Sequence, residues 1–215
     1  MITDAEYQAI LDRCRQIPPA KGDYREGDFV QNLFLTVVDF MLQGAVVENA
    51  VRHYRSNCFN DVRTIEDLTR LFERFPDDQA GNTALAQYLW GYNLWSRAEL
   101  LRRLVAFFES IGVTDQEHLR AWAANSKFDR DFKGRVKGLG YAVYNWLVMR
   151  QGVETVKPDV HLHRFVESIV QHPVSDEELV TALERAATDL NVKAYELDWR
   201  IWERQRGTGL ELWMK

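Results

Sequence analysis

Residues 132–142 read FKGRVKGLGYA, a stretch in which Gly138 and Gly140 flank the single apolar residue Leu139. Apolar residues recur at helical spacing on both sides of the stretch, which predicts a tight turn between two helices. Glycine permits such a turn, and the amides that open the second helix then point outward together, where they can hold a phosphate. We expect Leu139 to fill the space between the two helices and close the hairpin.

Basic side chains gather just before this turn, against two acidic ones, Asp129 and Asp131. The basic residues are Lys127, Arg130, Lys133, Arg135 and Lys137. The whole chain carries a net charge of -5, which argues against non-specific coating of nucleic acid, because phosphate binding draws on Lys and Arg. A local basic cluster in an acidic protein indicates an anion-binding face, and an ordinary turn with a solvated charged surface is the alternative.

A second informative stretch, residues 156–165, reads VKPDVHLHRF. Asp159 follows Pro158 and precedes a helical pattern, so we expect it at a helix N-terminus, where an N-cap is its simplest role. The helix dipole favours negative charge there, and an ionised, oriented carboxylate can stabilise a sugar cation or activate water. His161 and His163 would face apart on a helix, so we expect no metal site but one locally bonded and one exposed imidazole.

The rest of the sequence shows helical periodicity without convincing alternation of strand type, which predicts an all-α fold. Thr64 is placed to cap one helix, and two capping boxes mark further helix starts. The boxes pair Thr114 with Glu117 and Ser175 with Glu178. These signals specify helix boundaries and carry no information about function.

Composition indicates a protein of the cytoplasm, or of the nucleoid if DNA is its partner. The chain has 215 residues, of which 46% are hydrophobic, and its start is polar and acidic rather than of signal-peptide type. Its longest apolar run, 33–42, is interrupted and too short for a bilayer, so we expect no membrane association. The two cysteines, Cys14 and Cys58, fit neither a disulfide framework nor zinc spacing and are expected to be free thiols.

At the hairpin and at Asp159 the chain resembles the helix-hairpin-helix DNA glycosylases, the endonuclease III-like superfamily. That family combines an apolar-Pro-Gly-apolar-Gly hairpin, a helix, a short loop and an Asp-x-His-apolar-x-Arg run. Here residues 136–140 and 159–164 stand in that order and spacing. Residues 42–45 and 91–98 add weaker likenesses, so the resemblance covers roughly residues 29–170.

The resemblance implies an all-α architecture of two lobes. Residues 29–152 would form a helical barrel that carries the hairpin, and residues 1–28 and 153–215 would form a second helical lobe, with the crossing near Pro18 and Pro19. In that family the catalytic aspartate lies in the cleft between the lobes, a position that Asp159 would occupy.

The resemblance also implies which residues contact DNA. Gln43 would fill the gap left by a flipped nucleotide, which offsets part of the cost of extruding the base. The implied DNA-binding set is Gln43, Lys133, Arg135, Lys137, Gly138, Leu139, Gly140 and Tyr141. The aromatic candidates for stacking on an extruded base are Trp90, Tyr92, Tyr144, Trp146 and His161. Core packing is the alternative for each of these rings.

Departures from the family pattern refine the expected chemistry. Ala142 stands where strand-cleaving members carry a lysine, so no Schiff base can form there. The tail lacks a four-cysteine cluster, so no iron–sulfur centre or other cofactor is expected. Lys137 replaces the hairpin proline, and Val160 stands where a small polar residue is common.

The sequence therefore predicts a monofunctional, monomeric DNA glycosylase that acts on double-stranded DNA with a damaged base. Two alternatives stay open: a DNA-binding module on the same fold without catalysis, and a helical protein-interaction scaffold, which the acidic balance favours weakly. The lesion, the role of His163 and the roles of the C-terminal aromatic residues are not specified by sequence spacing.

Overall fold

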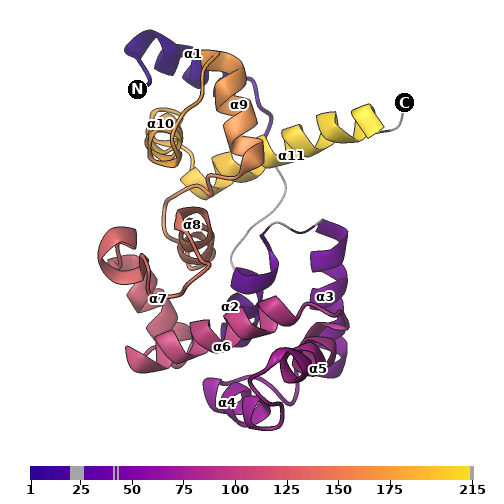
Figure 1. Cartoon of the computed structure of the whole chain (residues 1–215). Helices are drawn as coiled ribbons and strands as arrows, with labels where there is room; N and C mark the ends of the chain where they lie inside the picture. The colour runs from indigo at the N-terminus through magenta and orange to yellow at the C-terminus, as the bar shows by residue number, and fades with distance from the viewer. Residues whose placement is uncertain (20–26, 41, 43, 214–215) are drawn as a thin grey trace. The chain divides into compact units, whose positions relative to one another are not determined.

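Helices make up every regular element in the part of the chain that the structure describes. The computed structural model describes residues 1–19, 27–40, 42 and 44–213, with side chains as far as Gln205. The elements in Figure 1 are α1 (Asp4–Arg15), α2 (Phe29–Val38), α3 (Gly44–Asn57), α4 (Ile65–Glu73), α5 (Gln79–Trp90), α6 (Trp95–Ser110), α7 (Gln116–Asn125), η1 (Phe128–Phe132), α8 (Tyr141–Arg150), α9 (Val160–Val170), α10 (Asp176–Asp189) and α11 (Ala194–Trp213). The predicted all-α class is confirmed. No helix in these described ranges combines the length and apolar character needed to cross a membrane.

Side-chain caps fix where several helices begin. Thr64 accepts a hydrogen bond from the amide of Asp67, whose carboxylate accepts one from the amide of Thr64, at 3.1 and 3.0 Å. Ser175 and Glu178 form the same reciprocal pair at 3.2 and 2.9 Å. Each pair satisfies two amides that have no partner inside the helix. The N-cap at Thr64 and the capping box at Ser175 are therefore confirmed.

One helix start differs from the sequence prediction. The capping box predicted at Thr114 and Glu117 is wrong, because Asp115 is the N-cap of α7 and accepts from the amide of His118 at 2.8 Å. Helix α5 begins at Gln79, because Asp78 accepts from the amide of the third helical residue at 2.7 Å.

The chain divides into two compact units. Unit 1 comprises Met1–Arg25 with Tyr144–Lys215, and unit 2 comprises Glu26–Val143. The division falls inside α8 rather than at residue 152, where the sequence places it. Residues 144–150 of α8 therefore belong to unit 1.

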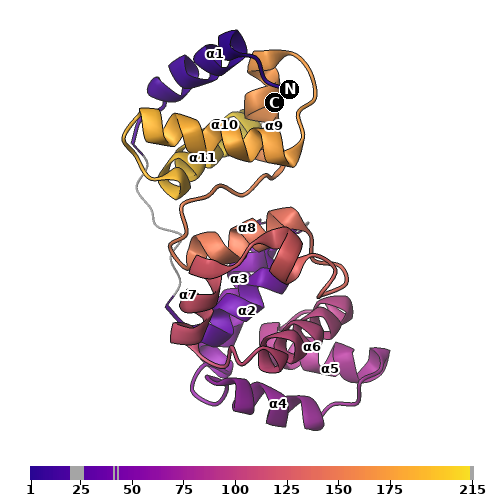
Figure 2. The ribbon, with the colours of Figure 1, turned by 90° about the vertical axis from the view of Figure 1, so that its left-hand side faces the viewer.

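Unit 1 is built around four helices, α1, α9, α10 and α11, which pack against one another (Figure 2). Its core includes Ile10, Leu162, Leu183 and Leu197, whose side chains are at most 1% exposed. These residues come from four different helices, so apolar burial holds the ends of the chain together.

Unit 2 is organised around the buried helix α2 and the pair α5 and α6. Phe34 on α2 stacks on Tyr54 of α3 at 5.6 Å and meets Trp90 of α5 edge-on at 5.3 Å, measured between ring centroids. All three rings are at most 1% exposed. The aromatic content of this half of the chain therefore serves its core to a large extent.

The two cysteines are buried free thiols, as the sequence predicts. Burial raises the pKa of Cys14 to about 12 and that of Cys58 to about 11. Because the thiolate is the reactive form, neither residue is suited to nucleophilic chemistry.

Gly81 packs so closely against the preceding turn that a side chain cannot be placed there. A Cβ atom at this position would lie 2.0 Å from the carbonyl oxygen of Pro76. We predict that Gly81→Ala lowers the free energy of unfolding by about 2 kcal/mol, because the backbone of the turn must move. Gly27→Ala, where a Cβ meets nothing within 4 Å, serves as the control and should change stability by less than about 0.5 kcal/mol. Urea unfolding of both variants measures the difference, and equal stabilities would contradict the close contact.

The imidazole of His172 links the loop after α9 to α1. Its Nδ1 lies 2.9 Å from the carbonyl oxygen of Pro173, and its Nε2 lies 3.0 Å from Glu6 Oε1. Both partners only accept hydrogen bonds, so the doubly protonated ring fits the site best. The carbonyl of Pro173 first, and then Glu6, raise the pKa of His172, while the amide and hydroxyl of Thr3 and the imidazole lower the pKa of Glu6.

These shifts give a pH window for the contribution of the pair to stability. Because the pKa of His172 is raised in the folded protein, its contribution to the free energy of unfolding is fully present below the ordinary histidine pKa of 6.5. This contribution is lost as the pH rises through the pKa of the folded state. Because the pKa of Glu6 is lowered in the folded protein, its contribution to the free energy of unfolding is fully present above the ordinary glutamate pKa of 4.5. We predict that His172→Gln lowers the melting temperature more at a pH between these two values than at about pH 8.5. Thermal unfolding at both pH values tests this, and an equal loss at both would rule out the charged pair.

Candidate nucleic-acid interface

The predicted hairpin forms with its apolar residues inside and its polar residues outside. Val136 and Leu139 are 1% and 5% exposed, whereas Lys137, Gly138 and Gly140 are exposed. The amide of Leu139 donates to the carbonyl of Val136 at 3.1 Å, which closes the turn. Burial of Leu139 agrees with its predicted role, and it leaves the adjoining backbone on the surface.

The two hairpin glycines are required for different reasons. Gly138 has φ +99°, a conformation unfavourable to other residues, and a Cβ there would lie 3.2 Å from Leu100 on α6. A Cβ at Gly140, by contrast, would meet nothing within 4 Å. The fold therefore accounts for Gly138. The open backbone at Gly140, directly before α8, is accessible to an external group such as a phosphate.

The element that enters the hairpin differs from the sequence prediction. Instead of an α-helix, the five-residue π-helical turn η1 leads in, and Gly134 with φ +72° follows it. Short π-helical segments are uncommon and occur often at functional sites. The chain therefore enters the hairpin through a single wide helical turn and a glycine of positive φ, not through a regular α-helix.

This turn pairs two of the predicted basic residues with the two aspartates. Arg130 donates to both carboxylate oxygens of Asp131 at 2.7 Å, and Lys133 Nζ lies 2.8 Å from Asp129 Oδ1. The hydrogen bonds from Arg130, followed by that from the amide of Lys127, hold the pKa of Asp131 below its usual value. Lys133, which the sequence places in the DNA-binding set, is thus engaged locally.

Three cations of the cluster stay available on the surface. Lys127, Arg135 and Lys137 are exposed and form no ion pair with any residue that the structure describes. Two of them, Arg135 and Lys137, adjoin the exposed backbone of the hairpin. We call residues 135–140 the hairpin surface.

Tyr141 is the first residue of α8, and its ring packs against the turn that precedes the hairpin. Its half-buried ring meets Phe128 of η1 edge-on, at 5.2 Å between centroids. This contact links the turn before the hairpin with the helix after it. Tyr141 therefore helps to fix the hairpin surface, in addition to lying next to it.

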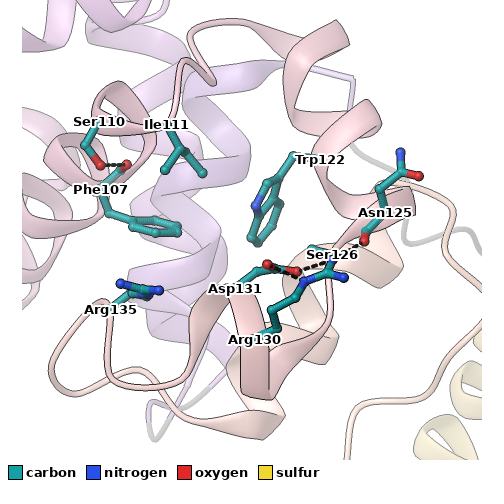
Figure 3. A pocket seen from close by; sticks show the side chains of 9 residues that line it. All are labelled: Phe107, Ser110, Ile111, Trp122, Asn125, Ser126, Arg130, Asp131 and Arg135. Atoms are coloured by element: carbon teal, nitrogen blue, oxygen red, sulfur yellow. Dashed lines mark hydrogen bonds and ion pairs between the residues drawn. The ribbon is translucent and has the colours of Figure 1, made fainter.

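An open cavity of about 430 Å³ lies beside this surface, in unit 2 (Figure 3). Its walls come from the end of α6, from α7, from η1 and from Arg135 of the hairpin surface. Phe107 and Trp122 contribute aromatic walls, and Arg130 and Arg135 contribute charge. Sequence reasoning missed Phe107 and Trp122, because they are distant in sequence and each fits a helical core pattern.

Asp159 lies in unit 1, where it is the N-cap of α9, as the sequence predicts. Its Oδ1 atom accepts from the amides of His161 at 2.8 Å and Leu162 at 3.2 Å. The other oxygen, Oδ2, forms no hydrogen bond with the described residues. The half-buried carboxylate is thus oriented through one oxygen and keeps the second for another partner.

The segment before Asp159 is anchored to α11. The amide of Lys157 donates to Oδ2 of Asp198, a carboxylate only 2% exposed, at 2.8 Å. A buried hydrogen bond to a charged acceptor is among the stronger ones in proteins. It fixes the backbone two residues before Asp159 and therefore the direction of the cap.

The two histidines after Asp159 contact different partners, and both are half-buried. His161 meets Trp202 of α11 edge-on, at 6.3 Å between ring centroids. His163 Nε2 lies 2.8 Å from Asp176 Oδ1, and its Nδ1 lies 3.4 Å from Glu167. In the described ranges no group of three or more ligating side chains is arranged for a metal.

The aromatic candidates for a base pocket are largely structural. Trp90 is completely buried in unit 2, so its prediction as a stacking surface is wrong. Tyr92 is half-buried, and its hydroxyl accepts from Asn49 at 3.3 Å. In unit 1, Tyr144 and Trp146 are 6% and 7% exposed.

Trp146 is further enclosed by two cations. The guanidinium of Arg150 lies 4.7 Å from its ring centroid, and the ammonium of Lys157 lies 4.8 Å from it. These cation–π contacts use the ring within unit 1. Gln43, the predicted plug for the DNA stack, lies outside the described residues.

These features define an all-helical protein with a basic, glycine-containing hairpin in one unit and an oriented N-cap carboxylate in the other. The chain belongs to the family described as Domain of unknown function (DUF8548), whose model matches residues 8–206. No curated protein and no solved structure matches the chain.

The geometry of Gly140 yields a test that separates binding from folding. We predict that Gly140→Ala weakens binding of a fluorescein-labelled DNA duplex about tenfold, because a methyl group hinders phosphate approach and loses about 1.5 kcal/mol of charge-assisted hydrogen bonding. Fluorescence anisotropy measures the affinity. The unfolding free energy should change by less than about 0.5 kcal/mol, because the added Cβ meets nothing. Gly27→Ala, at another glycine where an added Cβ meets nothing within 4 Å, should bind as the wild type does. Unchanged affinity of Gly140→Ala would remove the hairpin surface from the binding site.

Proposed function

We propose that this protein binds double-stranded DNA that carries a damaged base and releases that base by hydrolysis, as a monofunctional member of the helix-hairpin-helix glycosylase superfamily. The observation that carries the proposal is the hairpin, whose glycine backbone is exposed next to unpaired cations while its apolar residues are buried. A plain connecting turn needs neither the open backbone at Gly140 nor the exposed cations Arg135 and Lys137.

The hairpin surface would bind the phosphate backbone. The amides at the start of α8 point along the helix axis, and the helix dipole adds to their attraction for an anion. Arg135 and Lys137 supply the long-range attraction that brings a polyanion to this part of an acidic protein. Such contacts position the duplex without reading its sequence, as suits an enzyme that must search many sites.

Asp159 would carry the chemistry. As the bond between C1′ and the damaged base breaks, positive charge develops on the sugar, and an ionised carboxylate stabilises it. Water then supplies the hydroxyl group at C1′, and its proton leaves with the base. Oδ1 is committed to the amides of α9, so Oδ2 is the oxygen that would face the sugar or the water.

The reaction would stop at an abasic site. Ala142, the second residue of α8, has no amine with which to form a Schiff base to the sugar. Chain cleavage through that route is therefore not expected, and the product strand stays intact until it is treated separately.

A second function is favoured by one specific observation. The N-cap role of Asp159 already accounts for an aspartate at this position, since it accepts from two amides. A DNA-binding module of the same fold without catalysis would have the same cap. The two functions differ in whether the charge of Asp159, rather than its cap, is needed.

Asp159→Asn separates these roles because asparagine caps a helix about as well as aspartate but carries no charge. We predict that base release from duplexes with alkylated, deaminated or oxidised bases falls by a factor of about 10² to 10⁴. Duplex affinity should be retained, and the unfolding free energy should change by less than about 0.5 kcal/mol. Abasic product is revealed by heating, and unheated strands should stay uncut.

Asp78→Asn is the matched control, because Asp78 caps α5 through the same type of bond and has no proposed role in catalysis. It should leave base release unchanged. Binding without release by the wild type on every lesion would replace the glycosylase with the binding module. Duplex affinity that does not fall with rising salt would exclude both and favour a protein-interaction scaffold.

A further inference from the structure

The aromatic walls of the cavity beside the hairpin are held rigidly by their neighbours. Phe107 of α6 and Trp122 of α7 meet edge-to-face, with centroids 6.3 Å apart and ring planes at 76°. Behind them Phe108 and Phe132, both completely buried, lie 5.1 Å from Trp122 and 5.7 Å from Phe107 respectively. The two half-buried rings are therefore held in one arrangement and present aromatic surface to the cavity.

The rim of the cavity carries a fixed and a free cation. Arg130 is held by Asp131 through two hydrogen bonds and by the carbonyl of Asn125 through a third at 2.8 Å. Arg135 is exposed and forms no ion pair with the described residues. Figure 3 shows Arg135 on the side of Phe107, and Arg130 with Asp131 on the side of Trp122.

The charge balance favours an anionic ligand. Asp131 is the single acidic side chain among the described residues that line the cavity, and Arg130 covers both of its oxygens. Arg135 also helps to lower the pKa of Asp131, but with two arginines against one aspartate the charged side chains of the lining leave a net positive charge. At about 430 Å³ the cavity is of a size that accommodates a small ligand such as one nucleotide.

We infer that this cavity binds an unpaired nucleotide of a nucleic-acid strand, with the base against Phe107 and Trp122 and a phosphate at Arg135. Aromatic platforms beside cations are the usual means of holding single-stranded nucleic acid, since every base offers a flat face. Arg135 belongs both to the cavity and to the hairpin surface, so a strand on the hairpin can continue into the cavity. The inference deepens the proposed function, on which it rests, by adding a site for single-stranded DNA.

Ile111 allows the chemistry of the occupant to be tested without disturbing the core. It lines the cavity, is 45% exposed and follows the last residue of α6. The matched variants Ile111→Glu and Ile111→Lys remove the same apolar surface and introduce opposite charges. The probe is a fluorescein-labelled decamer of deoxythymidine, with anisotropy measured at about 50 mM salt.

Ile111→Glu should weaken decamer binding about tenfold, and Ile111→Lys should bind at least as well as the wild type. Equal losses in both variants would show that apolar contact governs binding, as for an apolar peptide, and would overturn the inference. Absence of decamer binding by the wild type would overturn it as well.

A second probe tests the aromatic platform. A decamer of the same phosphate backbone without bases should bind the wild type more weakly than the deoxythymidine decamer, because it cannot stack. Equal affinities would overturn base binding in the cavity.

This result is separable from catalysis. Asp159→Asn should bind the decamer as the wild type does, because Asp159 is not part of the cavity. If no lesion is released but decamer binding still follows the charge at position 111, catalysis fails and the nucleotide site stands. If bases are released but both Ile111 variants bind the decamer equally, the nucleotide site fails and the glycosylase stands.

Discussion

The backbone conformation at Gly138 is the constraint on which the hairpin depends. A positive φ lets the chain reverse within a few residues while Val136 and Leu139 both reach the interior. Leu100 of α6 lies so close to this turn that a Cβ at Gly138 would approach it to 3.2 Å. With the apolar residues buried on one side, Lys137 and Gly140 necessarily lie on the other. The conformation of Gly138 therefore separates the hairpin into a buried apolar side and an exposed side, the hairpin surface, which carries backbone groups and cations.

Local ion pairing determines which cations near the hairpin surface stay available to a ligand. The π-helical turn η1 brings Asp131 against Arg130 and Asp129 against Lys133, and exposed pairs of this kind contribute little to stability. Their larger effect is on recognition: two cations are held close to carboxylates, while Arg135 and Lys137 stay available. The same pairing orients Arg130 at the cavity, where a fixed guanidinium is more useful than a mobile one.

Asp159 shows how one carboxylate can serve structure and chemistry together. The cap consumes Oδ1 and sets the direction of the side chain, and the buried hydrogen bond from Lys157 to Asp198 holds the preceding backbone. A group that is positioned by its own helix needs little reorganisation when charge develops nearby. The cap and the proposed catalytic role are therefore compatible, since they use different oxygens.

The sequence alone determined the all-α class, the cap at Thr64, the box at Ser175, the hairpin and the N-cap position of Asp159. Each depends on residues within a few positions of one another, where capping, glycine conformation and periodicity act. The cap of α7 also lies within that range, but Asp115 takes the place predicted for its neighbour Thr114. The close packing of Gly81 depends on the turn at Pro76, which no periodic pattern reveals.

Tertiary packing alone decided that Trp90 is a core residue and that Phe107 and Trp122 form the wall of a cavity. It also decided that His163 pairs with Asp176 on another helix. These side chains follow the same helical pattern as many others in the chain. What distinguishes them is which distant residue lies opposite, and only the packing of the helices sets that.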